Sequence, residues 1–469
     1  MPKLTVIEDG VKRELYFEGE KLLSELIQNI GSKLSHPCGG KGSCKKCGVI
    51  ANGKEVLSCR FKISDDTEVI IPEVSEISSV TGAEETGKLT DRVCLCLDIG
   101  TTTLALALVS TDGKNIIRTV TDTNPQRSFG ADVISRIEYC SKNGVSDLRD
   151  SVVNAINAMV KRLFDEFKLS SVPTMYVAGN TTMLHCFFGV DCSSMGVSPY
   201  TPTFVEAQVK KGSECGIVGV ENVVSLPSVS AFVGADIVAG INYVDLPETG
   251  KYSLLVDLGT NAEIVVFDSE NLLCTAAAAG PCFEGVNISC GMSASDGAVC
   301  AYFSDGKYDT VGGAVPKGIC ATGLVDIIAE AVRNETIDES GYMEDDLVIS
   351  DGVMLTPKDV REFQLAKSAV LSAIECLLEK LNADIEDVDK IYVAGGFSAA
   401  LKVKNAVFVG LLPKGSESRF VPVNNSSLLG TVRFACENSD LSFVKNARYI
   451  DVSADGSFSD KFFENMYFA

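Results

Sequence analysis

The sequence predicts a small α+β domain at the N-terminus and, after a linker, a larger α/β domain built from two similar halves. Three observations support this division. Four closely spaced cysteines lie between residues 38 and 59, and an apolar strand that ends in Asp-x-Gly occurs twice, near residues 98 and 257. A third apolar strand ends in the glycine pair 395–396. A chain of 469 residues has room for two or more domains.

The small domain is expected over residues 1–75. Residues 3–8 and 12–17 are typical of two short strands joined by a turn at Asp9-Gly10. Residues 20–30 carry apolar side chains at helical spacing, and the pattern stops at Gly31. The core of so small a domain is thin, so a bound metal centre would contribute to its folding stability.

The four cysteines of this domain have a spacing that indicates an iron–sulfur site. Cys38, Cys44, Cys47 and Cys59 follow the pattern C-x5-C-x2-C-x11-C, close to the plant-type C-x4-C-x2-C run with a distant fourth cysteine. Glycines within this run allow tight turns around a cluster. The lysines at 41, 45 and 46 would offset its negative charge.

Strand, strand, helix and cysteine loop is also the order in which a β-grasp ferredoxin begins. We therefore expect a ferredoxin domain whose four cysteines hold a [2Fe–2S] cluster. A structural zinc site is the alternative, but zinc sites usually pair two CxxC dipeptides. Only Cys44 and Cys47 form one here.

Composition limits the partners. The chain has 41 Lys plus Arg against 63 Asp plus Glu, a net charge of −22, which argues against nucleic acid and anionic membranes as partners. It has no stretch of eighteen apolar residues and no apolar signal-peptide core in its first thirty residues. Seventeen cysteines in such a chain indicate free thiols in a reducing cytoplasm.

Other potential ligands are expected to be structural. Most of the remaining cysteines lie singly in apolar stretches, and Cys94 and Cys96 alternate along a strand. His36 and His185 are the two histidines, and we expect ordinary structural roles for both. Residues 73–91 are acidic and rich in Ser and Thr, which predicts a linker over 76–91. An ordered surface strap is the alternative for this segment.

The larger domain carries a repeated strand–turn–strand pattern. Residues 92–109 and 252–267 are each two apolar strands joined at a bend. Glycine lets the backbone approach a phosphate, its neighbours donate N–H and O–H groups, and aspartate holds Mg2+ directly or through water. Two such copies suggest an internal duplication with one phosphate loop in each half. The residues concerned are Asp98, Gly100, Thr101, Thr102 and Thr103, and Asp257, Gly259, Thr260 and Asn261.

The third signal is a strand over 390–398 that runs into Gly395 and Gly396, after a long helix expected at about 359–382. A glycine pair at the end of a strand gives side-chain-free backbone against which an adenosine can lie. Residues 175–183 show a related pattern in the first half, where Asn180 could reach a phosphate.

Together and in this order, these segments resemble the superfamily of acetate and sugar kinases, heat-shock chaperones and actin. The resemblance implies an actin-like ATPase over 92–469, with lobes of roughly 92–250 and 251–469 and ATP in the cleft between them. The sequence contains neither a GxxxxGK[ST] loop nor a GxGxxG after a first strand, so P-loop and Rossmann folds lack support.

A CGGKGSCKKC run ahead of such an ATPase resembles the reductive activators of corrinoid proteins. Further runs carry the same likeness: 124–140 (NPQRSFGADVISRIEYC), 230–240 (SAFVGADIVAG) and 276–299 (AAAAGPCFEGVNISCGMSASDGAV). Better-known long members have an additional middle domain, for which the linker here leaves no room. Dimer contacts that such a domain supplies are therefore in doubt, although the family suggests a homodimer.

The family implies an ATP-dependent transfer of one electron, from an external low-potential donor through the [2Fe–2S] cluster to the corrinoid protein of a methyltransferase system. Inactive Co(II) would return to Co(I). Asp98 and Asp257 are the candidates for holding Mg2+ and positioning the attacking water, and Glu263 is a candidate general base. The small-residue run 276–299 is either a loop close to the ligand or a packed turn.

Other functions stay open from the sequence. An activator of a radical dehydratase or ring reductase would share the mechanism, but those activators lack a ferredoxin module. A redox sensor that uses the nucleotide fold as a switch is a second alternative. A metabolite kinase is the least favoured, because it has no use for an iron–sulfur domain.

Overall fold

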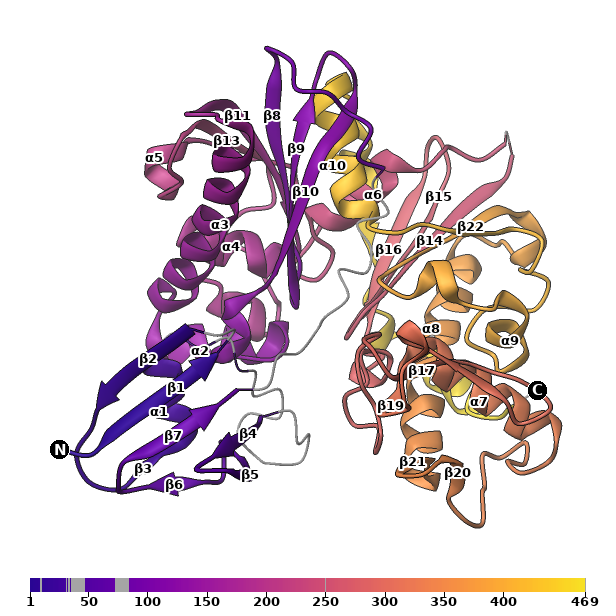
Figure 1. Cartoon of the computed structure of the whole chain (residues 1–469). Helices are drawn as coiled ribbons and strands as arrows, with labels where there is room; N and C mark the ends of the chain where they lie inside the picture. Colours follow the sequence, from indigo (N-terminus) through magenta and orange to yellow (C-terminus); the bar gives the residue numbers. More distant parts are fainter. Residues whose placement is uncertain are drawn as a thin grey trace.

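The computed structural model describes residues 1–8, 11–30, 32, 34, 47–71, 84–248 and 250–468. Figure 1 shows a small sheet at the N-terminus, drawn in indigo, and two larger lobes, one with the strands labelled β8, β9, β10, β11 and β13 and the other with β14, β15, β16 and β22. Cys38, Cys44, His36, the turn at Asp9-Gly10 and Gly31 lie outside the described residues. Among the described helices, none is long and apolar enough to cross a membrane.

The N-terminal sheet has the strand order β2-β1-β7-β4-β5, and a two-stranded β3-β6 ribbon lies beside it. β1 pairs antiparallel with β2 and parallel with β7. Alternating residues of β1, together with Leu23 and Ile27 of α1, form its buried core. The elements are β1 (Lys3–Glu8), β2 (Val11–Tyr16), β3 (Lys21–Leu22), α1 (Leu23–Asn29), β4 (Gly48–Ala51), β5 (Lys54–Leu57), β6 (Lys62–Ile63) and β7 (Thr67–Ile70).

The two predicted strands and the helix of this region are present. The helix begins at Leu23, three residues later than predicted, because Lys21 and Leu22 pair with β6 instead.

Lobe I contains a six-stranded sheet in the order β10-β9-β8-β11-β13-β12. Every residue of β8 is buried, as expected for a central strand that is covered on both faces. The elements are β8 (Val93–Ile99), β9 (Thr103–Ser110), β10 (Asn115–Thr123), α2 (Val133–Asn143), α3 (Ser146–Phe167), β11 (Val172–Gly179), α4 (Thr181–Phe188), β12 (Val209–Lys211), α5 (Gly212–Cys215), β13 (Val220–Ser225) and α6 (Ala235–Tyr243).

Lobe II contains a second six-stranded sheet, β23-β22-β14-β15-β16-β24, and two small accessory sheets. The elements are β14 (Tyr252–Leu258), β15 (Ala262–Phe267), β16 (Leu272–Ala277), β17 (Ala298–Tyr302), β18 (Tyr308–Thr310), β19 (Gly318–Ile319), α7 (Ala321–Arg333), β20 (Leu347–Ser350), β21 (Val353–Leu355), α8 (Pro357–Lys380), β22 (Val388–Ala394), α9 (Val403–Phe408), β23 (Phe420–Pro422), α10 (Ser426–Glu437), β24 (Ala447–Tyr449) and α11 (Gly456–Glu464).

The long helix predicted at about 359–382 is α8. It begins two residues earlier than predicted because Thr356 and Asp359 form a capping box and Pro357 occupies the first turn.

The two large sheets repeat one arrangement, which accounts for the duplicated sequence pattern. In each, an antiparallel hairpin supplies the central strand, β8 or β14, which then pairs in parallel with a strand from later in the lobe, β11 or β22. The bends of both hairpins therefore lie at the same edge as the ends of those parallel strands.

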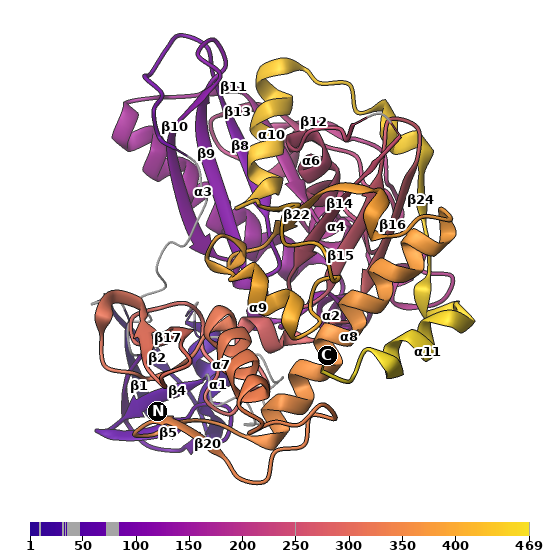
Figure 2. The same ribbon diagram turned by 90° about the vertical axis from the view of Figure 1, so that its right-hand side faces the viewer.

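α10 packs on lobe I, although its residues lie beyond the predicted lobe boundary at residue 250. This helix comes from the second half of the sequence, but its Leu428 packs with Cys94 and Cys96 of β8 in lobe I. Figures 1 and 2 both show α10, in yellow, beside β8 and α6. The approach is close, because a side chain at Gly430 would collide with the backbone of Ala239 in α6.

The described end of the linker segment is attached to lobe I. Glu85 bridges to Ile116 and pairs with Arg118 on β10, and the Gly87 amide donates to the Ile116 carbonyl. Residues 84–91 therefore run along the edge strand of lobe I, as the alternative of an ordered strap expects.

Candidate functional site

The bend between β8 and β9 forms the first loop, residues 98–103, and two buried residues bind its carbonyl groups. Asn124 donates its side-chain amide to the Gly100 carbonyl, at 2.8 Å, and its backbone N–H to the Thr102 carbonyl, also at 2.8 Å. Arg136 of α2 donates to the Thr101 carbonyl at 2.5 Å. Three successive carbonyl oxygens are thus bound on the side of Asn124 and Arg136.

This arrangement directs amide groups to the opposite side of the loop. In a trans peptide the C=O and N–H point in opposite directions, so the amides that follow these carbonyls face away from Asn124 and Arg136. Within the described residues, the amides of Thr101 and Thr102 have no hydrogen-bond acceptor. Successive free amides of this kind form a concave site for an anion.

Asn180 lies next to this loop at the start of α4. Its side-chain oxygen accepts from the Met183 amide and caps the helix, and its side-chain nitrogen donates to the Thr101 hydroxyl at 3.1 Å. Asn180 therefore contacts the loop to which the sequence assigns it, through a side chain whose orientation the helix cap fixes.

The bend between β14 and β15 forms the second loop, residues 257–261. The Gly259 amide donates to the Asn261 carbonyl, and in the described structure the amides of Thr260 and Asn261 have no acceptor. The Thr260 hydroxyl donates to Glu284 at 2.6 Å. Glu284 belongs to the run 276–299, so this part of the run lies against the second loop.

The glycine pair after β22 lies beside the second loop. Gly395 has a φ of +104°, and a Cβ there would be 2.6 Å from the Leu258 carbonyl oxygen. Only glycine fits both the dihedral angle and the space. A Cβ at Gly396 would have no atom within 4 Å, so Gly396 borders open space.

Four carboxylates gather near the two loops. Asp98 is buried at the end of β8, where it accepts hydrogen bonds from Ser427 at 2.7 Å and Asn425 at 2.8 Å. Burial raises its pKa, against the lowering effect of these two donors. Burial and the charge of Asp98 raise the pKa of Asp257 to about 6.

Asp236 and Glu263 complete this group. Burial, followed by the charges of Asp98 and Asp257, raises the pKa of Asp236 to about 7. Burial raises the pKa of Glu263 well above its usual range, with Asp236 and Asp257 adding to the effect. The four carboxyl groups therefore interact with one another, and a cation placed among them would be strongly favoured.

In the described parts of the chain, no group of three or more His, Cys, Asp or Glu side chains could hold a metal ion by itself. Mg2+ keeps several waters and usually binds through one or two carboxylates plus substrate phosphates. The donor set fits a Mg2+–nucleotide complex better than a protein-only metal site.

Two of the four cysteines predicted to bind a cluster lie in the described structure. The buried sulfurs of Cys47 and Cys59 are 3.2 Å apart, on either side of the β4–β5 hairpin. Two thiolates bound to one tetrahedral metal at about 2.3 Å would lie about 3.7 Å apart. The pair is close to that separation, so both sulfurs fit as ligands of one metal atom.

Sequence reasoning missed several residues of the site. Asn124 and Arg136 lie in a run that was noted only for its resemblance, and Asp236 lies in another. For Asn425 and Ser427, the sequence offers one indication, an Asn-Asn-Ser-Ser run ahead of a helix. This run predicts a helix cap but not a contact with Asp98.

His185 is in a structural position. Its Nδ1 lies 2.7 Å from the Thr181 carbonyl, its Nε2 accepts from the Thr203 amide, and its ring stacks on Phe204. Burial lowers its pKa.

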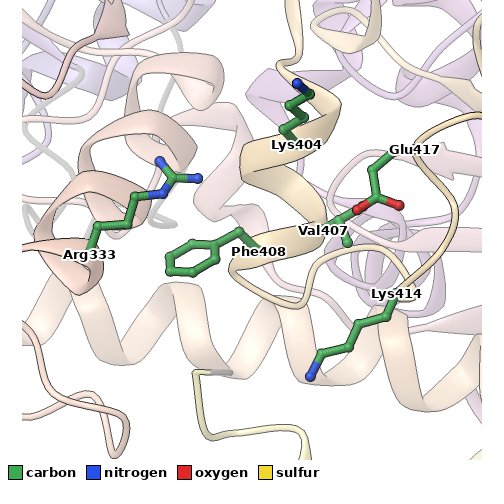
Figure 3. Close-up of a pocket in the computed structure, with 6 residues that line it drawn as sticks. All are labelled: Arg333, Lys404, Val407, Phe408, Lys414 and Glu417. Carbon is green, nitrogen blue, oxygen red and sulfur yellow. The ribbon is translucent and has the colours of Figure 1, made fainter.

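A cavity of about 670 Å³ opens elsewhere on lobe II. Figure 3 shows the Phe408 ring pointing toward Arg333 on one side of it, with the guanidinium 4.3 Å from the ring centre. The cavity shares no residue with the two loops. It is lined by Arg333, Lys404, Val407, Phe408, Lys414 and Glu417.

Comparison with known proteins identifies the large domain. A family model described as the C-terminal domain of RACo, the ASKHA domain, matches residues 251–469. A second, described as the RACo middle region, matches residues 93–249. The actin-like fold predicted for this part of the chain is therefore confirmed, and the region matched as the middle is lobe I.

Relatives match over the whole chain. The corrinoid activation enzyme RamQ of Eubacterium limosum is 25% identical, and the match covers 98% of each chain. Its alignment spans 586 residues, more than the 469 here, so that relative has segments with no counterpart in this chain. The [Co(II) methylated amine-specific corrinoid protein] reductase of Methanosarcina barkeri is 26% identical over 75% of this chain and 71% of its own.

A solved structure shows the same fold. The protein described as reductive activator for corrinoid, iron–sulfur protein superimposes with a TM-score of 0.72 at 25% identity, over 100% of this chain and 98% of its own. With two consecutive RACo family matches and these relatives, the chain belongs to the family of reductive activators of corrinoid proteins.

Proposed function

We propose that this protein uses ATP to drive the transfer of one electron, through a [2Fe–2S] cluster, to a corrinoid protein of a methyltransferase system, and so returns inactive Co(II) to Co(I). The observation that carries the nucleotide part is the pair of loops with free amides, Thr101 and Thr102 in one lobe and Thr260 and Asn261 in the other, beside a group of four carboxylates.

The nucleotide is best accommodated with its phosphates at the two loops. The free amides of both loops would donate to phosphate oxygens, and Gly100, Thr103 and Gly259 shape the bends. Asp98 and Asp257 would hold Mg2+ through its waters. Gly396, which borders open space, would face the adenosine, and Gly395 would bring the strand end against Leu258.

Asp236 is the carboxylate best suited to act as general base. Its pKa of about 7 is near the operating pH, which is where a general base works best. The pKa of Glu263 lies well above its usual range, so at neutral pH this group holds its proton more firmly. We therefore prefer Asp236 to Glu263.

The N-terminal region is best assigned as a β-grasp ferredoxin domain. The order β2-β1-β7-β4-β5, with a parallel pair in the middle, is that of a β-grasp sheet. A [2Fe–2S] cluster supplies one-electron transfer when bound. Cys47 and Cys59 would be two of its ligands, and Cys38 and Cys44 are assigned as the others from their spacing alone.

We keep a ferredoxin domain over 1–75 and an ATPase over 92–469. Within the linker predicted over 76–91, residues 84–91 are assigned as a strap on lobe I. α10 is assigned by contact to lobe I rather than to lobe II. A cytoplasmic location, an external low-potential electron donor and a homodimer belong to the same proposal.

ATP is needed because the electron must move to a lower potential. A plant-type [2Fe–2S] cluster lies near −400 mV, and a one-electron shortfall of about 0.2 V corresponds to about 4–5 kcal/mol. The nucleotide can supply this only by favouring one conformation of the complex over another. Movement of the two lobes relative to each other is the natural candidate.

The test follows the corrinoid spectrum of a purified Co(II) corrinoid protein under a low-potential reductant, with and without Mg–ATP. We expect Co(I) only when ATP is present, and none with Cys47→Ser. The matched control is Cys300→Ser, a partly exposed cysteine that donates to a carbonyl in lobe II. ATP hydrolysis without cobalt reduction across a panel of corrinoid partners would overturn the proposal.

A further inference from the structure

Arg136 is a fully buried arginine, and its direct partners among the described residues include no carboxylate. Its side chain makes four contacts: Nε donates to the Gly130 carbonyl at 2.9 Å, one terminal nitrogen to the Thr101 carbonyl at 2.5 Å, and the other to the Met183 sulfur at 2.9 Å and to Gln126 at 3.4 Å. A buried charge is costly unless an opposite charge compensates it.

The surrounding charges do not remove this cost. Burial, with a smaller effect of Arg127, lowers the pKa of the guanidinium to about 10, although Cys186, Asp132 and Glu284 act to raise it. Asp132 uses its carboxylate to cap α2. Glu284 lies in lobe II, where it accepts from Thr260 of the second loop. Glu284, which contacts the second loop, is therefore near enough for its charge to act on Arg136.

The contact with Thr101 links this charge to the first loop. The guanidinium binds the carbonyl of the peptide whose N–H belongs to Thr102, one of the free amides. A cation on the oxygen of a peptide polarises it, which makes its N–H a stronger donor. Since the N–H points the other way, positive potential is delivered on the side where an anion would bind.

We propose that Arg136 is the positioning residue of the first phosphate loop: acting through the Thr101–Thr102 peptide, it holds the loop's amides toward the nucleotide phosphates, whose negative charge compensates the buried guanidinium. This inference rests on the proposed function, because it takes the anion to be the phosphate chain of ATP. Arg136 does not touch the phosphate. A lysine ammonium is a point donor without the planar fork by which Nε and a terminal nitrogen of Arg136 each bind one of the Gly130 and Thr101 carbonyls.

The test measures binding of Mg–ATP and of adenosine to the full-length protein by titration calorimetry, for the wild type, Arg136→Met and Arg136→Lys. We expect Arg136→Met to weaken Mg–ATP binding by about tenfold or more, as for loss of a hydrogen bond to a charged group. Arg136→Lys should lose several-fold. Adenosine, which lacks phosphates, should bind all three proteins equally.

The matched control is Arg149→Met, which removes another lobe I guanidinium that donates to a carbonyl, that of Glu214. It should bind Mg–ATP as the wild type does. If Arg136→Met does not fold, Arg136→Lys decides.

The outcomes separate the two proposals. Failure of the wild type to bind Mg–ATP would overturn the proposed function itself. Normal Mg–ATP binding by the folded Arg136 variants, or an equal loss for ATP and adenosine, would overturn only the role of Arg136, since a general structural defect affects both ligands.

Discussion

The side-chain amide of Asn425 donates to the carboxylate of Asp98 at 2.8 Å, across 327 residues of sequence. The same Asn425 side chain caps α10, because its oxygen accepts from the Leu428 amide. One residue thus fixes both the start of α10 and the orientation of an aspartate beside the first loop. Any displacement of α10 would change the surroundings of Asp98.

Asn425→Asp should preserve the helix cap and destabilise the site. Aspartate caps a helix as well as asparagine does, but its carboxylate would face Asp98 and replace a donor with a like charge. We expect the free energy of unfolding to fall by about 1–3 kcal/mol at pH 8, and by less at pH 5. Denaturant unfolding at both pH values measures this. Ser427→Ala removes the other donor to Asp98 without adding charge, so its unfolding free energy should depend less on pH. An equal pH dependence in the two variants would contradict charge repulsion between residue 425 and Asp98.

Mg–ATP should stabilise the protein more at pH 8 than at pH 6. The raised pKa values of Asp236, about 7, and Asp257, about 6, mean that the native state binds more protons than the unfolded chain above pH ~4. As pH rises toward 7, ionisation of these groups in the native state therefore lowers the free energy of unfolding. A bound cation offsets this loss, because it compensates their negative charges. Thermal unfolding with and without Mg–ATP tests this. The Asp236→Asn variant should show a smaller pH dependence, and an unchanged one would contradict the role of this carboxylate.

Asp236→Asn should abolish most ATP hydrolysis while nucleotide binding persists. Loss of a general base typically costs about 10²–10⁴ in rate, whereas Mg–ATP binding should weaken much less, because Asp98 and Asp257 remain to hold Mg2+ through its waters. Steady-state hydrolysis gives kcat, and calorimetry gives the affinity. Asp440→Asn is the control, since Asp440 is an exposed turn residue that accepts hydrogen bonds from Ser442 and lies outside the carboxylate group. An unchanged kcat in Asp236→Asn would contradict Asp236 as the general base and leave Glu263 as the candidate.

Alanine substitutions in the glycine pair should affect different properties, protein stability at Gly395 and ATP binding at Gly396. Gly395→Ala places a methyl group 2.6 Å from the Leu258 carbonyl at a φ of +104°, so we expect a loss of about 1–3 kcal/mol in unfolding free energy. Gly396→Ala has no atom within 4 Å of the new Cβ, and stability should stay within about 0.5 kcal/mol. If Gly396 faces the adenosine, its variant should nevertheless weaken ATP binding. Wild-type affinity in Gly396→Ala would place the base elsewhere.

The sequence was informative where local patterns determine the structure. Both hairpins, the glycine pair and the N-terminal strands follow from apolar periodicity and turn residues, which act within a few positions. The repeated Asp-x-Gly bends predicted two equivalent loops, because the same local sequence folds in the same way in each lobe.

Residues that act over long separations could not be found in this way. The contacts of Asn425 with Asp98 and of Arg136 with Thr101 depend on tertiary packing, and neither polar residue differs locally from an ordinary helix cap or surface arginine. For the same reason, the predicted lobes of 92–250 and 251–469 gave no indication that α10 packs on lobe I. Nothing in residues 426–437 indicates that the helix packs on a strand made more than 300 residues earlier.

The packing of α10 on β8 also sets the order in which the protein is completed during synthesis. One face of the lobe I sheet lacks its covering helix until residue 437 has left the ribosome, well after β8. At about 5–20 residues per second, this interval is on the order of tens of seconds. The nascent chain therefore exposes an apolar sheet face that includes Cys94 and Cys96 for that time, and holding chaperones should bind it there.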